Sequence, residues 1–124
     1  MTDISALARR YHDDVHAASL SAVPGEPEAQ LTTPVSNLFT ALVMHAGLGT
    51  LKLVRESPLG GSRPDFAALH QRGSRTHQVG FIELKAPSVA MDPVSWTGRN
   101  ATQWQKMSQE AEILLLCNGR SARL

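Results

Sequence analysis

Two segments decide the fold that this sequence predicts: Arg63-Pro-Asp65 and, after thirteen intervening residues, Val79-Gly-Phe-Ile-Glu-Leu-Lys85. The second segment has the composition of a strand, and successive strand side chains point to opposite faces. Glu83 and Lys85 therefore share one face, about 7 Å apart along the strand. The strand ends before Pro87, because proline has no N–H to give to a sheet ladder.

Asp65 lies at the start of another strand-like run, which ends at Leu69. A polar loop, residues 70–78, joins this run to the segment that starts at Val79, and two strands so joined read as a hairpin. The hairpin would bring Asp65 alongside Glu83. Carboxylates so placed suit a hard divalent cation, and a neighbouring lysine can orient a metal-bound water or balance charge on a phosphoryl group.

Taken alone, the triplets Arg63-Pro-Asp65 and Glu83-Leu-Lys85 favour a plainer interpretation. They would form an exposed turn and a surface ion pair between Glu83 and Lys85, which contributes little to stability. Three features favour the functional interpretation. The charged pair lies in the most apolar strand-like segment of the central region, where unpaired charge is costly. The spacing permits one hairpin, and the residues on both sides extend the same pattern.

Over residues 28–119 the chain resembles the PD-(D/E)XK nuclease module at the N-terminus of single-chain (type ISP-like) restriction–modification enzymes. In those proteins a helicase and an adenine methyltransferase follow the nuclease, and similar modules precede other adenine-specific DNA methyltransferases. The matching segments are Arg63-Pro-Asp-Phe-Ala67, Gly80-Phe-Ile-Glu-Leu-Lys-Ala-Pro87, Trp96-Thr-Gly-Arg-Asn100, Gln103-Trp104 and Leu114-Leu-Leu-Cys-Asn-Gly119.

The resemblance implies a metal-dependent DNA endonuclease that hydrolyses phosphodiester bonds with Mg²⁺ or Mn²⁺. It implies Asp65 and Glu83 as metal ligands and Lys85 as the catalytic lysine. Glu28 resembles an acidic residue that relatives place on the first helix facing the metal, and Gln103 matches a glutamine on the helix after the lysine strand. The implied partners are DNA and the methyltransferase and helicase modules, whose motifs this sequence lacks.

Two departures from the family pattern bear on activity. Gly98-Arg-Asn100 stands where relatives usually have Gly-His-Asp, and the sequence ends at Leu124, where relatives continue into another strand and helices. We therefore expect a domain truncated at its C-terminus, with an open sheet edge that favours self-association, for example as a homodimer. The alternatives are a non-catalytic relic of the nuclease fold, a DNA-binding or interaction module, and a structural protein with an accidental motif.

Composition indicates one small domain, with 124 residues of which 42% are hydrophobic. The absence of a long apolar run and of a targeting signal predicts a cytoplasmic protein without a membrane span. A single cysteine excludes an internal disulfide. A net charge of +1 is too small to indicate nucleic-acid binding. The candidate DNA contacts are Arg63, Arg72 and Arg75, although solvation of a hairpin tip explains the last two equally well.

The expected fold is α/β, a restriction-endonuclease-like α/β sandwich with a mixed sheet of about four strands flanked by helices, in the order α-α-β-β-β-α-β. Residues 1–27 would form an N-terminal helix and a Pro/Gly linker, and residues 28–119 the nuclease core. Asn100 is a candidate N-cap of the third helix. The expected helices and strands are Ile4–Leu20, Glu28–Ala46, Leu51–Arg55, Asp65–Leu69, Val79–Lys85, Asn100–Gln109 and Ile113–Cys117.

Overall fold

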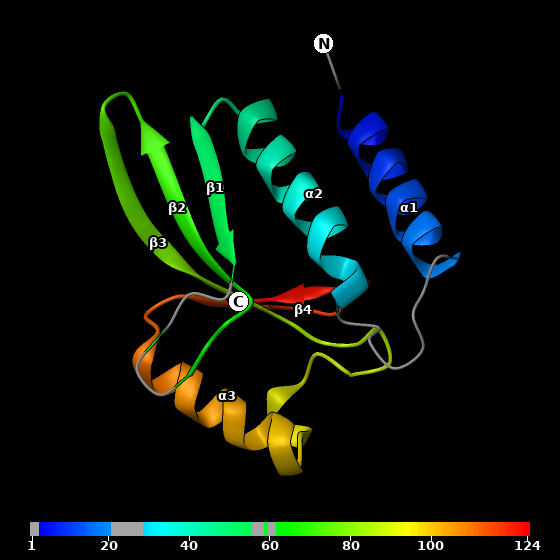
Figure 1. Ribbon diagram of the computed structural model, residues 1–124, viewed down its shortest axis with the longest axis vertical. Coiled ribbons are helices and arrows are strands. Elements are labelled where there is room, and N and C mark those ends of the chain that lie inside the picture. Colours follow the sequence, from blue (N-terminus) through cyan, green and yellow to red (C-terminus); the bar gives the residue numbers. More distant parts are fainter. Residues whose placement is uncertain (1–2, 21–28, 56–58, 60–61) are drawn as a thin grey trace.

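The computed structural model describes residues 3–20, 29–55, 59 and 62–124. Within these residues the chain is α/β, with a mixed five-stranded sheet in the order β1-β2-β3-β4-β5. Figure 1 shows α1 and α2 on one side of the sheet and α3 on the other. The expected class and order of elements are therefore confirmed, and one further strand is added. The elements are α1 (Ile4–Leu20), η1 (Ala29–Leu31), α2 (Thr32–His45), β1 (Thr50–Arg55), β2 (Phe66–Arg72), β3 (Arg75–Leu84), η2 (Pro93–Ser95), α3 (Gly98–Glu110), β4 (Leu114–Cys117) and β5 (Ala122–Arg123).

The strands β1, β2 and β3 form an antiparallel meander, so the predicted hairpin is present. It is longer than expected, because the ladder continues through the polar residues as far as the pair of Arg72 and Arg75. Gly73, with a φ of 63°, turns the chain at the tip. Residues 71–79 are exposed, so polar side chains form this arm without burial of charge. Residues 70–78 lack the apolar alternation of a half-buried strand, and for this reason the sequence predicted a loop there.

A crossover through α3 places β4 parallel to β3. The expectation that β4 is the last strand, with nothing beyond it, is wrong. Asn118 Oδ1 accepts the N–H groups of Arg120 and Ser121 at 3.0 and 2.9 Å, and Gly119 adopts a φ of 84°. This turn returns the chain antiparallel to β4 as β5.

The apolar core lies between the sheet and α2. α1 packs beside α2, and the Tyr11 hydroxyl donates a hydrogen bond of 2.7 Å to the Gly119 carbonyl. Burial raises the pKa of Tyr11 and of the Cys117 thiol. Lys85, directly after β3, reaches toward α3, and Glu83 of β3 contacts the Lys85 side chain. The buried members of the core are Leu31, Val35, Phe66, Ile82, Leu84 and Cys117.

Two helix starts differ from the prediction. The predicted start of the second helix, Glu28, lies outside the described residues, and over residues 29–31 the 3₁₀ turn η1 leads into α2. Pro34 occupies the first turn of α2, where its missing N–H costs nothing. α3 begins at Gly98, so Asn100 lies inside its first turn and is not its cap. A membrane span needs a longer or more apolar helix than any in the described residues.

Candidate active site

Lys85 lies at the centre of a polar cluster between β3 and α3, and its side chain is only 3% exposed. Its Nζ lies 3.3 Å from Glu83 Oε2, 3.2 Å from Asn100 Oδ1 and 2.9 Å from Gln103 Oε1. An ammonium group has three N–H donors, so these three oxygens satisfy all of them. The centroid of the Trp96 ring is 5.6 Å from the same Nζ, within the range of a cation–π interaction. Together these contacts offset the cost of burying the charge.

Glu83 is 6% exposed and contacts both Lys85 and Asp65. Burial, a side-chain hydrogen bond with Asp65 and the negative charge of Asp65 raise the pKa of Glu83 to about 8, while Lys85 acts in the opposite direction. Asp65 Oδ2 accepts the backbone N–H of Leu84 at 2.7 Å. Two carboxyl groups are therefore held side by side next to an ammonium.

The hairpin and the crossover bring these side chains together. Asp65 immediately precedes β2, whose first residue pairs with Ile82, so Asp65 lies level with Glu83 on the neighbouring strand. The Lys85 N–H donates a hydrogen bond of 2.8 Å to the Cys117 carbonyl, which extends the pairing of β3 with β4 as far as the lysine. The backbone on both sides of the carboxyl groups is thus fixed by the sheet.

Four of the predicted site residues meet in this cluster: Asp65, Glu83, Lys85 and Gln103. Gln103 is brought into the cluster by its hydrogen bond to Lys85 Nζ, and its role at a metal site stays a prediction. The fifth residue, Glu28, lies outside the described residues, so its place at the site stays a prediction.

The three predicted DNA contacts lie at two different places. Arg63 is exposed and lies two residues before Asp65 along the chain. Arg72 and Arg75 form the last pair of the β2–β3 hairpin. They are six residues along β2 from its first residue, or about 20 Å from the carboxyl groups. The structure therefore does not bring these two arginines to the site.

Asn100 and Trp96 belong to the cluster although the sequence did not identify them. Asn100 and Gln103 are three residues apart on α3, and residues at that spacing are neighbours on a helix surface. Once Gln103 is predicted to face the site, this spacing indicates that Asn100 faces it too. Trp96 has no such signal. Its ring is positioned by the turns between β3 and α3, where Nε1–H donates to the Ala90 carbonyl at 2.7 Å.

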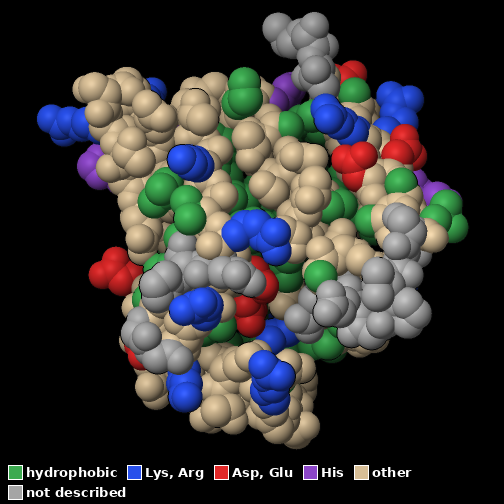
Figure 2. All heavy atoms as spheres, in the orientation of Figure 1, with side chains coloured by type: hydrophobic (Ala, Val, Ile, Leu, Met, Phe, Trp, Pro, Cys, Tyr) green, Lys and Arg blue, Asp and Glu red, His purple; other side chains and the backbone are tan. Residues whose placement is uncertain are grey.

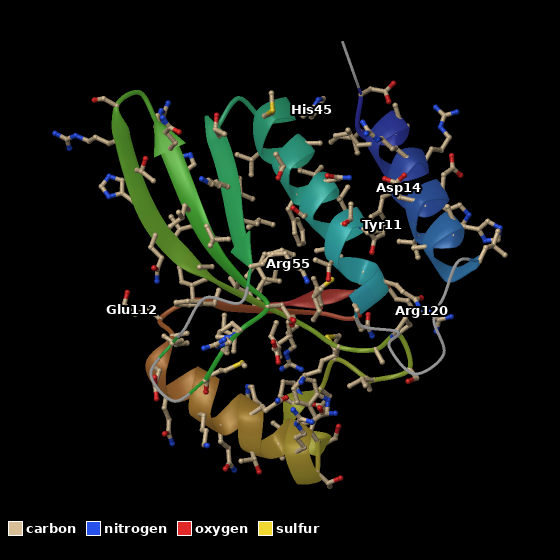
Figure 3. The ribbon with its side chains drawn as sticks, viewed as in Figure 1. Tyr11, Asp14, His45, Arg55, Glu112 and Arg120 are labelled. Carbon is tan, nitrogen blue, oxygen red and sulfur yellow. The ribbon has the colours of Figure 1, made fainter. Side chains whose placement is uncertain are left out.

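Two further exposed arginines lie close to the cluster along the chain or the sheet. Arg55, labelled in Figure 3, ends β1 and pairs with Phe66, the residue after Asp65. Arg99 precedes Asn100 in the first turn of α3. On the face that Figure 2 shows, Lys and Arg side chains surround a small acidic patch. Positive side chains close to a carboxyl pair suit an anionic ligand.

The carboxyl pair fits a hard divalent cation. Mg²⁺ in proteins is usually held by one or two carboxylates, and waters and substrate phosphate complete its coordination. Ionisation of Glu83 is unfavourable in part because of Asp65, and a cation between the two groups would favour it. In the described part of the chain no group of three or more His, Cys, Asp or Glu residues could hold a metal ion. A cation bound here would therefore take its protein ligands from the pair of Asp65 and Glu83, with waters completing its coordination.

No family model, curated protein or solved structure matches this chain. Its function is therefore inferred from the geometry and chemistry of the polar cluster.

Proposed function

We propose that this chain is a metal-dependent DNA endonuclease module of a restriction–modification system, with a restriction-endonuclease-like fold. The observation that carries the proposal is the meeting of Asp65, Glu83 and Lys85, in which two carboxyl groups and an ammonium converge from a hairpin and a strand end. A mixed sheet with helices on both faces, and a parallel strand pair joined through α3, supports the proposed fold.

Asp65 and Glu83 would hold the divalent cation, which when bound would polarise a phosphoryl oxygen and lower the pKa of a bound water. Lys85 would donate an N–H to an oxygen of the scissile phosphate and stabilise the negative charge that develops there. The Leu84 N–H fixes the Asp65 carboxyl, and Gln103 orients the lysine. Because the cluster is buried, these charges interact more strongly than they would in water.

DNA is the proposed substrate because exposed arginines flank the carboxyl pair. Arg55, Arg63 and Arg99 suit contacts to phosphates next to the scissile bond. Arg72 and Arg75, about 20 Å away, suit a phosphate roughly six base pairs farther along the duplex. Such contacts position the backbone and carry no base specificity.

Nicking of supercoiled plasmid in Mg²⁺ or Mn²⁺ tests the proposal. We expect weak, sequence-independent nicking, faster with Mn²⁺, because a net charge of +1 attracts DNA only weakly. Lys85→Met keeps the side-chain length without the charge and should lower the nicking rate about a hundredfold. Lys106→Met removes an exposed lysine from α3 and is the matched control, with unchanged nicking expected. Equal nicking by the wild-type and Lys85→Met proteins would contradict the proposal.

A non-catalytic DNA-binding or interaction module is the second candidate. One observation favours it: each buried side-chain nitrogen or oxygen atom in the described residues has a hydrogen-bond partner. The buried polar atoms of the cluster thus have protein partners and need no metal ion to satisfy them. This candidate predicts retention of DNA in a gel-shift assay without nicking in either cation.

A further inference from the structure

The Lys85 ammonium lies closer to the amide oxygens of α3 than to the carboxyl group of its own strand. Nζ is 2.9 Å from Gln103 and 3.2 Å from Asn100, but 3.3 Å from Glu83. A hydrogen bond between an ammonium and a carboxylate is usually shorter than the contact to Glu83, at about 2.7–2.9 Å. The side chains of α3 therefore supply two of the three hydrogen bonds that hold the Lys85 ammonium, including the shortest.

The contacts on the α3 side come from one short segment, residues 96–103. Asn100 and Gln103 project from the same side of the helix, since they are three residues apart. The Trp96 ring, held by its own hydrogen bond to the Ala90 carbonyl, lies over the ammonium. This segment alone supplies two of the three hydrogen bonds and the aromatic contact.

We propose that Asn100 is a positioning residue that, with Gln103 and Trp96, holds the Lys85 ammonium in place when a cation engages the Glu83 carboxylate. The role of these contacts in catalysis rests on the proposed nuclease function. The hydrogen bonds themselves are present in the structure whatever the function is. If Glu83 alone held the lysine, then a cation that took the carboxylate would release the lysine at the moment when it is needed.

An amide suits this position better than a carboxylate. Its oxygen accepts an N–H without adding a negative charge, so the ammonium keeps its attraction for a phosphate. A carboxylate at position 100 would also hold the lysine, but it would pair with the charge and repel DNA. The two variants Asn100→Leu and Asn100→Asp therefore separate positioning from charge.

The test uses NMR of lysine ammonium groups in protein labelled with ¹⁵N-lysine. The sequence contains three lysines, and Lys52 and Lys106 are exposed, so they serve as internal references for Lys85. In Asn100→Leu we expect the Lys85 ammonium hydrogens to exchange with water about tenfold faster, the factor that matches loss of one hydrogen bond to a charged group. Asn100→Asp keeps an oxygen acceptor and should restore slow exchange. The control is Gln105→Leu, which removes an exposed amide from the same helix and should change nothing.

Wild-type exchange at Lys85 in a folded Asn100→Leu protein would refute the positioning role. If Asn100→Leu does not fold, Asn100→Ser shortens the side chain at the same position and gives the same comparison. A wild-type chain that shows the predicted exchange pattern but never nicks DNA would refute the proposed nuclease function and still support the positioning role. In an active chain, Asn100→Leu should lower kcat with little change in KM, whereas Asn100→Asp should raise KM.

Discussion

Glu83 is the residue whose environment has the clearest consequence for stability. Its pKa is 4.5 in an unperturbed state and about 8 in the folded protein, chiefly because of burial. Between these pH values the folded protein binds more protons at Glu83 than the unfolded chain does. The contribution of this group to stability therefore falls as the pH rises through that window, and it changes no further above a pH of about 8.

We expect the free energy of unfolding, measured in urea without divalent cations, to fall between about pH 5 and pH 8. A single carboxyl group contributes at most about 1.4 kcal/mol per pH unit to this slope. Glu83→Gln resembles the protonated carboxyl and should remove that part of the slope. Glu112→Gln alters an exposed carboxyl and should keep it. An unchanged slope in Glu83→Gln would mean that another group causes the pH dependence.

The strands and turns differ in how far the sequence predicts them. Alternation in β3 predicts that Glu83 and Lys85 share a face, and the spacing to Asp65 predicts the hairpin. The two residues of β5 carry no apolar pattern, so the sequence does not predict this strand. Asn118-Gly119 is typical of a turn, but a turn alone does not show that a strand follows. The contacts of Trp96 and Asn100 depend on how the turns after β3 fold back on the sheet, which local patterns do not determine.

The turn between β4 and β5 offers a test of this packing. Gly119 has a φ of 84°, and a Cβ there would lie 2.7 Å from Leu31 Cδ2, in the 3₁₀ turn η1. Gly73 has a φ of 63° at the exposed hairpin tip, and a Cβ there would meet nothing within 4 Å. Backbone strain should cost both alanine variants about 1 kcal/mol. Overpacking should bring the loss in Gly119→Ala to about 2–3 kcal/mol. Equal losses in urea denaturation would contradict the close contact of this turn with η1.

The sheet divides the molecule into an apolar side under α2 and a polar cluster under α3. β3 contributes to both, with Ile82 and Leu84 in the core and Glu83 in the cluster, because alternate residues of a strand point to opposite sides. The apolar core therefore fixes the strands on which the carboxyl groups and the lysine lie. Rigid placement matters for the proposed reaction, since a displacement of about 1 Å can lower the rate about a hundredfold.

The binding of Mg²⁺, measured by isothermal titration calorimetry, tests whether this cluster is a metal site. We predict one cation per chain and an affinity that falls in Asp65→Asn, which keeps an oxygen acceptor for the Leu84 N–H. The loss should be at least about tenfold, since even partners outside the coordination shell contribute that much. Asp92→Asn alters an exposed carboxyl paired with Arg123 and should bind like the wild type. Binding that Asp65→Asn leaves unchanged would contradict the metal site and the nuclease function proposed from it.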